Sequence, residues 1–268
     1  MARIAGDNPG YQFRMMRNGP GGKLTATPYG FELPSVTTII SATIPKPFSA
    51  GAWYGYRMGL EGVMEEYKGR SLPASAELLE KRLSEQGRNP NQQLDVSRNR
   101  GFSAHDVLEL LANGDEERAN EVARQEEATS DTAYGRAVLK WWAEKGSPDA
   151  YDRANKKTKW KAEQPVYSLK HGYAGTADLI GAGEVVDLKT HKPMVGFTKD
   201  GKGPAYLSDL IQLRAYRLAW EEMGNPAPQG NRIVIARPNG NYLEDYREVP
   251  ESLWLQCIEM YKHLEEVK

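Results

Sequence analysis

An acidic and a basic residue, Asp187 and Lys189, lie two positions apart within the apolar, β-branched run EVVDLKT. Side chains two apart on a strand point to the same face, so the two groups would be neighbours. Such a pair is either a surface ion pair of little energetic value or part of a site that holds a cation and orients a reacting anion. The spacing alone does not decide, because it recurs at Glu66–Lys68, Asp200–Lys202 and Glu266–Lys268.

A further acid, Asp178, ends the stretch GTAD in the preceding apolar run. If a tight hairpin joins the two runs, Asp178 lies nearly opposite Asp187. A connection of even length, for example residues 181–184, pairs them directly, whereas an odd one puts them on different faces. Two adjacent carboxylates repel unless a cation lies between them. The pair therefore favours a Mg²⁺ site, with Lys189 facing the same cavity.

Two more pairs of polar side chains have helical spacing. Gln212 and Tyr216 are four residues apart, where they share one face of a helix and could orient a strand of nucleic acid. His105 and Glu109 are one turn apart after Gly101. Each pair also has an ordinary reading, because an aromatic residue at helical spacing is usually core and a lone histidine is usually packed or solvated.

The elements that must position these residues follow from periodicity. The pattern predicts a short helix after Ser35, helices over 49–68 and 74–86, a polar linker over 87–99, and helical segments from about 100 to 146. Strands are expected at 164–170, 172–180, 184–190, 232–238 and 241–249, with helices over 206–223 and 251–266. This order predicts an α/β core over residues 96–268, with an N-terminal β/helical addition over 1–95 that caps the cleft.

The composition limits the class of protein. The 268 residues are 40% hydrophobic and 26% charged, which is ordinary for a soluble globular protein. No apolar run is long enough to span a membrane, and residues 1–13 lack a signal core, so we expect a cytoplasmic protein without membrane contact. The net charge of −1 gives no overall attraction to nucleic acid.

Cysteine usage limits the metal chemistry. Cys257 is the only cysteine, so the chain forms no internal disulfide and no thiolate cage for zinc or an iron–sulfur cluster. Any metal must be held by carboxylates, carbonyls, histidine and water, which favours Mg²⁺ or Mn²⁺.

A local basic cluster lies between residues 153 and 161. Basic residues interleaved with an aromatic suit a phosphate backbone and a stacked base, although charge runs are often only solvated faces. The residues expected to bind nucleic acid are Arg100, Lys156, Lys157, Lys159, Trp160 and Lys161.

Four motifs occur in order along the chain: Gly-x-x-x-His at 101–105, Gly-x-x-Asp at 175–178, Asp-x-Lys at 187–189 and Gln-x-x-x-Tyr at 212–216. Together they resemble the RecB-type branch of the PD-(D/E)XK nuclease superfamily, over about residues 100–220. More loosely, LPSVTTII followed by IPKP resembles the mitochondrial genome-maintenance exonuclease and related phage proteins. The interval from Asp178 to Asp187 is short for the family, which implies a tight hairpin.

The resemblance implies a restriction-endonuclease-like mixed sheet flanked by helices, and it implies roles. Asp178, Asp187, the Leu188 carbonyl and His105 would hold Mg²⁺ or Mn²⁺. Lys189 would position a water or stabilise the transition state, and Gln212 and Tyr216 complete the catalytic set. Glu163 is either a second-shell or second-metal acid or a solvated side chain, and the role of Glu109 stays open.

These roles predict a metal-dependent DNA exonuclease of a phage or bacterium that acts from free ends of single-stranded DNA in recombination or repair. Its expected partners are DNA and a phage recombination or single-strand-binding protein. Four alternatives stay open: a double-strand exonuclease of a recombination system, an endonuclease, a non-catalytic DNA-binding module, and an unrelated α/β protein with accidental motifs. Polarity, the number of metals and the oligomeric state are also open.

Overall fold

The computed structural model describes residues 14–17, 24–27, 31–44, 68, 76–85, 103–129, 132–146, 151–152, 157–181, 183–190 and 204–267. The chain divides into two compact units, one of Met1–Ile44 with Ser103–Lys268 and the other of Pro45–Phe102. The second unit contains α3 (Ala76–Glu85), within the helix expected over 74–86. Apart from the turn at Lys68, the helix expected over 49–68 and the linker over 87–99 lie outside the described residues.

Helix α1 (Val36–Thr43) begins where the sequence predicts, because Oγ of Ser35 accepts a hydrogen bond from the Thr38 amide at 2.9 Å. The helix packs on strand β7 (Tyr173–Gly181) in the first unit, and the amide of Ala174 donates to the carbonyl of Pro34 at 3.1 Å. The expected boundary between residues 95 and 96 lies outside the described residues. Residues 1–44 of the expected N-terminal addition belong to the unit that carries the main sheet.

The main sheet has five strands in the order β10-β9-β8-β7-β6. Besides β7, these are β6 (Trp160–Ser168), β8 (Glu184–Thr190), β9 (Gly230–Ala236) and β10 (Tyr242–Asp245). Strands β8 and β9 run parallel and the other neighbours run antiparallel. A parallel pair needs a crossover, which contains α7 (Leu207–Glu222). The sheet therefore places α7 directly after the strand that carries Asp187 and Lys189.

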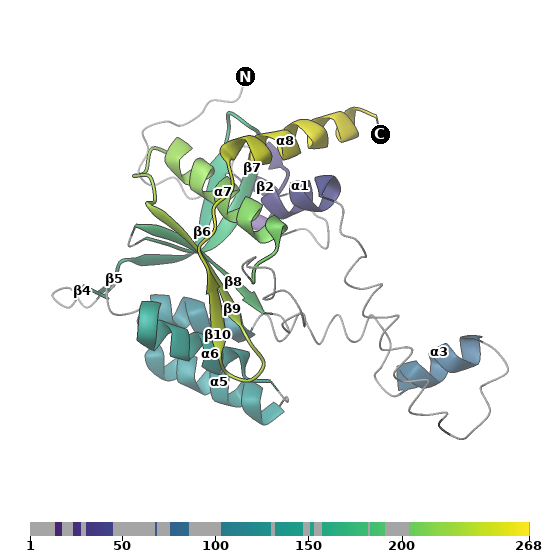
Figure 1. Cartoon of the computed structure of the whole chain (residues 1–268), viewed down its shortest axis with the longest axis vertical. Coiled ribbons are helices and arrows are strands. Elements are labelled where there is room, and N and C mark those ends of the chain that lie inside the picture. The colour runs from purple at the N-terminus through teal and green to yellow at the C-terminus, as the bar shows by residue number, and fades with distance from the viewer. Residues whose placement is uncertain are drawn as a thin grey trace. The chain divides into compact units, whose positions relative to one another are not determined.

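Helices cover both faces of this sheet (Figure 1). One face, called the α7 face, packs on α1, α7 and α8 (Glu251–Glu266). The other, called the α6 face, packs on the helix over residues 103–112, on α5 (Glu116–Thr129) and on α6 (Tyr134–Trp141), which continues as a π-helical segment, Trp142–Gly146. Side chains alternate between the two cores, as at Val185 and Val186. The mixed sheet flanked by helices confirms the expected α/β class.

Two smaller sheets complete the described strands. Strands β1 (Arg14–Arg17), β2 (Leu24–Thr27) and β3 (Phe31–Leu33) form one antiparallel sheet, and β4 (Tyr151–Asp152) pairs with β5 (Lys157–Thr158). Within the described residues, no helix has the length and apolar character needed to cross a membrane.

A tight hairpin joins β7 to β8, as the short interval between the two acids predicts. Gly181 pairs with Glu184, and the ladder ends at Leu179 and Val186. The next pair in this register would be Asp178 and Asp187. There the strands part: β8 continues beside β9 while β7 stays beside β6. Among the strands that the structure describes, none pairs with the edge of β8 opposite β9 from Asp187 onward.

Strands β6 and β7 both reverse their faces at one position. In β7, Ala177 packs in the α7-face core and Leu179 in the α6-face core, although residues two apart normally share a face. In β6, Val166 and Ala162 are divided in the same way. The ladder between β6 and β7 pairs Ala162 and Gln164 but not Glu163, which lies between them. Glu163 has a positive φ of 45°, which is unusual for a residue other than glycine. The observed strand begins at Trp160, four residues before the expected start. The change of face at Glu163 breaks the alternation of inward and outward side chains, so the sequence pattern does not reveal the first part of the strand.

Candidate active site

The carboxylate of Asp187 lies under α7, where two side chains contact it. Nζ of Lys189 is 2.6 Å from Oδ2, and Nε2 of Gln212 donates to Oδ1 at 3.0 Å. The Gln212 amide also binds the lysine, because Nζ donates to Oε1 at 3.2 Å. Asp187 and Lys189 therefore do share a face, as their spacing on the strand predicts, and the glutamine of the next helix joins them.

Tyr216 fixes the orientation of that glutamine. Its hydroxyl accepts a hydrogen bond from Nε2 of Gln212 at 2.9 Å, and its ring is buried. The ring packs directly on β7 at Gly175, where any side chain would clash with it. This contact gives a physical reason for the glycine of the Gly-x-x-Asp motif: only a residue without a side chain lets the aromatic ring lie against the strand.

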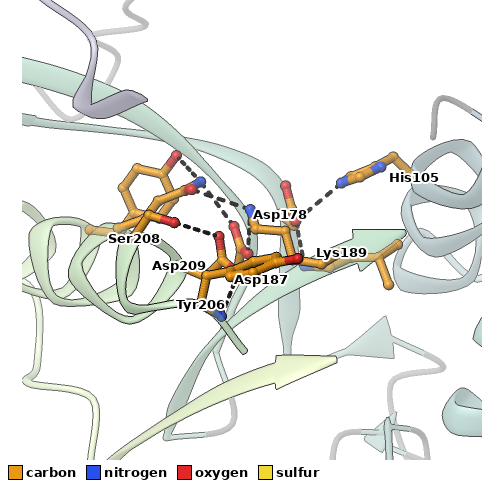
Figure 2. Close-up of polar contacts among 10 residues, drawn as sticks. His105, Asp178, Asp187, Lys189, Tyr206, Ser208 and Asp209 are labelled. Carbon is orange, nitrogen blue, oxygen red and sulfur yellow. Dashed lines mark hydrogen bonds and ion pairs between the residues drawn. The ribbon is translucent and has the colours of Figure 1, made fainter. Parts of the chain in front are cut away.

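Asp178 lies where β7 and β8 part, and it is contacted from two directions. The backbone amide of Leu188 donates to Oδ2 at 2.6 Å, and Nε2 of His105 is 3.3 Å from the same oxygen. His105 comes from the helix over 103–112 on the α6 face, whereas Gln212 comes from the α7 face. The sequence-predicted residues thus converge from both faces of the sheet at the position where two strands separate (Figure 2).

A third acid, Asp209, is close to this cluster and was not expected from the sequence. It is buried in the first turn of α7, and its charge acts on both Asp187 and Lys189. Its Oδ2 accepts a hydrogen bond from the amide of Tyr206 at 3.1 Å. An acid at the third position of a helix is ordinarily explained as part of a helix cap. Taken by itself in the sequence, Asp209 therefore gives no sign that it also lies beside the cluster. Its place one turn before Gln212 is the signal that could have revealed it.

The electrostatics of Asp187 are unfavourable for a charged carboxylate. Burial is the largest cause, and the negative charges of Asp178 and Asp209 add to it, so the pKa is raised to about 7 despite the attraction of Lys189. Lys189 itself keeps its proton: burial alone would lower its pKa, but Asp187, Asp209 and Asp178 raise it above its ordinary value. The cluster is therefore short of positive charge even with its lysine protonated.

Asp178 differs from Asp187 because it has more donors. Burial raises its pKa, but the charge and hydrogen bond of His105, the charge of Lys189 and the Leu188 amide together bring the pKa below its usual value. The two acids are therefore unequal, although they are neighbours in the same site. Asp178 is the one that stays ionised without further help.

The donor set suits a hard divalent cation. Oδ2 of Asp187 is buried and, among the described residues, receives no hydrogen bond of normal geometry, although Nζ of Lys189 is near. The amide of Leu188 points to Asp178. Since the N–H and C=O of one strand residue point to the same side, its carbonyl faces that side too. Two carboxylates and a carbonyl are ligands that Mg²⁺ and Mn²⁺ prefer.

No group of three or more His, Cys, Asp or Glu side chains in the described residues is already arranged around a metal position. A complete shell would therefore need water and backbone oxygen in addition to the two aspartates. Mg²⁺ commonly keeps several waters and binds through one or two carboxylates, so this arrangement agrees with its coordination habits.

The expected DNA-binding residues differ in their exposure. Trp160 was expected to stack on a base, but this is wrong for the folded protein: its side chain is buried in the α6-face core, and Nε1 donates to the Gly146 carbonyl at 2.9 Å. Lys159 and Lys161 are exposed, and Nζ of Lys161 lies 5.0 Å from the Trp220 ring centre. Arg100, Lys156 and the side chain of Lys157 lie outside the described residues.

The two glutamates of open role are both exposed. Glu109 lies one turn beyond His105 on the helix over 103–112. Glu163 lies within β6 rather than ahead of it, at the position where β6 and β7 reverse their faces.

Comparisons with known proteins identify the family of the chain. No curated protein matches the chain. The chain is similar to a solved structure titled "Crystal structure of SSO0001", with 14% identity over 50% of this chain and 72% of that chain and a TM-score of 0.30. The sequence model of the PD-(D/E)XK nuclease superfamily matches residues 78–252. That span includes every side chain of the cluster, from His105 to Tyr216, and the chain belongs to the PD-(D/E)XK nuclease superfamily.

Proposed function

We propose that this chain is a metal-dependent exonuclease that hydrolyses phosphodiester bonds from the free ends of single-stranded DNA. Superfamily membership indicates a nuclease, and such nucleases typically use Mg²⁺ or Mn²⁺. The observation that carries the proposal is the convergence of Asp178, Asp187, Lys189 and Gln212 where β7 and β8 part. Buried acids with a shortage of positive charge are what a cation site requires.

In this proposal Asp178, Asp187 and the Leu188 carbonyl hold the cation, and His105 adjoins them. A divalent cation bound there would neutralise charge on the scissile phosphate and make a water more acidic. His105 orients Asp178 through its 3.3 Å contact with Oδ2. Because outer partners of this kind fix the direction of a ligand, loss of the histidine should weaken the metal site rather than remove it.

Lys189 and Gln212 act on the reacting phosphate and on the acids. The ammonium group, which keeps its proton because of the surrounding acids, supplies a fixed positive charge for the transition state. Gln212 binds both Asp187 and Lys189 with one amide, and Tyr216 holds that amide in place. We infer that this network keeps the lysine beside the carboxylates in a single geometry.

The finer parts of the proposal rest on the four motifs and their order. These motifs support a place in the RecB-type branch, near the mitochondrial genome-maintenance exonuclease and related phage proteins. They also support a role in recombination or repair, with DNA and a phage recombination or single-strand-binding protein as partners. For DNA contact we keep Lys159 and Lys161, which are exposed, together with Arg100, Lys156 and Lys157.

The test is digestion of four DNA forms of one sequence: linear and circular, each single- and double-stranded. We expect degradation of linear single strands with Mg²⁺ or Mn²⁺, resistance of circles, and complete loss of activity in EDTA. An Asp187→Asn protein prepared in parallel controls for contaminating nucleases.

Each other result assigns a different function. Cutting of circular single strands would show an endonuclease, and preference for linear duplex would show a double-strand exonuclease. Binding of DNA without cleavage by the wild-type chain under every metal tested would show a non-catalytic module and overturn the proposal.

A further inference from the structure

The start of α7 carries an aromatic side chain beside the proposed catalytic cluster. Tyr206 precedes the first residue of the helix, and 39% of its surface is exposed, next to Leu207 with 52% exposed. Farther along the same helix lie Asp209, Gln212 and Tyr216, which belong to the cluster or adjoin it. Figure 2 shows Tyr206 beside Asp187 and Asp209.

The backbone around Tyr206 is held by specific hydrogen bonds. The amide of Ala205 donates to Oδ2 of Asp245 at 3.0 Å, and Nη2 of Arg247 donates to the Ala205 carbonyl at 2.8 Å. The amide of Tyr206 itself donates to Asp209 at 3.1 Å. An exposed ring on so constrained a backbone has a defined position, which lowers the entropy lost when it binds a flat partner.

The position lies within reach of a nucleotide next to the bond being cut. A helix rises about 1.5 Å per residue, so Tyr206 is roughly 9 Å along the axis from Gln212, which contacts Asp187 and Lys189. Asp209 connects the two regions, because its charge acts on Tyr206 and on Asp187 alike. The base of a nucleotide whose neighbouring phosphate reaches the acids could therefore contact the start of α7.

We propose that Tyr206 is a stacking platform for one unpaired base of the DNA strand, at the nucleotide beside the scissile phosphate. This proposal rests on the proposed function and deepens it, because it names the feature of the substrate that this residue recognises. Every base has a π-face, so stacking on an aromatic ring is independent of sequence. The bases of an intact duplex are already stacked on one another, so the platform favours single strands or frayed ends.

The ordinary alternative is that the ring only covers the start of α7. Three variants separate the two readings: Tyr206→Ala removes the ring, Tyr206→Leu keeps apolar bulk without an aromatic face, and Tyr206→Phe keeps the face. Tyr246→Ala is the matched control, because Tyr246 is also half-exposed in the same unit but lies 5.2 Å from Arg232 at another place. Melting temperatures show whether each variant folds.

The measurement is binding of a linear single strand in EDTA, where cleavage does not interfere. The strands carry 2-aminopurine or one abasic nucleotide, moved stepwise through the terminal nucleotides. For intact strands we expect about tenfold weaker binding by the Ala and Leu variants and an unchanged affinity for the Phe variant and the Tyr246→Ala control. With the abasic nucleotide at one particular position, wild type and Tyr206→Leu should bind within about twofold of each other.

Quenching of 2-aminopurine at that same position by the wild type and the Phe variant supports stacking. Equal losses on intact and abasic strands, or no loss in the Leu variant, would overturn it. Cleavage by the wild type with Mg²⁺ is scored separately. If the strand is cut but affinity does not depend on the ring, only the platform fails; if stacking is seen without any cleavage, only the nuclease proposal fails.

Discussion

Two aspartates that the structure describes, Asp187 and Asp245, each have a basic residue two positions later, and they serve different purposes. Asp187 and Lys189 lie on β8, whereas Asp245 is the last residue of β10 and Arg247 follows two positions later. Both carboxylates are almost fully buried, with 1% and 3% exposed. Asp245 accepts hydrogen bonds from the amides of Ala205 and Arg247 and from the Arg247 guanidinium. Burial raises its pKa, but these donors outweigh burial and leave the pKa below its usual value.

Asp187 has the same spacing to its basic partner and is equally buried, but its pKa is shifted in the opposite direction. Its pKa is raised to about 7 because burial and two neighbouring acids outweigh its lysine. The number of donors per carboxylate and the sign of the surrounding charge therefore separate a structural ion pair from a site that needs a further cation. The spacing of acid and base does not.

The largest expected difference is in cleavage. Asp187→Asn should reduce the cleavage rate of linear single-stranded DNA by about a thousandfold or more, because it removes a proposed cation ligand and the partner of Lys189. The protein should stay folded, since the change relieves repulsion among three acids. Single-turnover cleavage with Mg²⁺ and a melting curve measure both effects. Cleavage at near the wild-type rate would place the site elsewhere.

The reciprocal change should affect stability instead. Asp245→Asn leaves the Arg247 guanidinium without its carboxylate and weakens the hold on Ala205, so we expect a loss of about 2–3 kcal/mol in the free energy of unfolding. Urea titration measures it. The cleavage rate per folded molecule should stay within about tenfold of wild type, a smaller effect than that of Asp187→Asn. A stable Asp245→Asn protein with no cleavage would show that both pairs belong to the catalytic machinery.

Gln212→Ala tests the network that distinguishes the first pair. Loss of an outer partner that orients a ligand typically costs 10- to 100-fold, so we expect cleavage to fall by about that factor. Arg217→Ala is the matched control on the same helix, because its guanidinium pairs with Glu221 and Glu248 away from the cluster. Equal losses in both variants would assign the effect to the helix as a whole.

The smallest expected effect is a dependence of stability on pH without metal. The pKa of Asp187 is about 7 in the folded protein and near 4 when unfolded. The folded state holds this proton more tightly, so stability should fall as the pH rises from about 4 to about 7. Asp245 has the opposite sign, since its lowered pKa makes its contribution disappear only in acid.

Urea titrations in EDTA at several pH values measure the effect, with Asp187→Asn as the control that should remove the decline between pH 4 and pH 7. Added Mg²⁺ should restore stability at pH 7 in the wild type and much less in the variant. A metal-free wild type with no decline in that range would show that Asp187 is not electrostatically strained.

The sequence predicts much of the fold because its signals there are local. Gly181 and Gly183 punctuate two apolar runs, and that fixes a tight hairpin whose register brings Asp178 toward Asp187. The spacing of Gln212 and Tyr216 places both on the face of α7 that covers β8. These predictions come from the periodicity of the sequence, which depends only on residues close together in the chain.

What the sequence does not show depends on contacts between distant segments. The basic run around Trp160 looks like an exposed surface until the helices of the α6 face are seen to pack on β6, where they bury the tryptophan. Asp209 looks like a helix cap until α7 is placed over β8. The contact between Gly175 and Tyr216 is likewise invisible, because no local pattern says which ring fills the space above a glycine.

The reversal of faces at Glu163 and Asp178 limits how the lengths of β6 and β7 can change. Deleting one residue from β6 alone would exchange inward and outward side chains on one side of the deletion and expel Trp160 or Val166 from its core. A matched deletion in β7 would restore agreement between the strands but would remove the position that directs Asp178 to Leu188. Insertions and deletions in these two strands are therefore tolerated only in pairs, and even then the proposed metal site is lost.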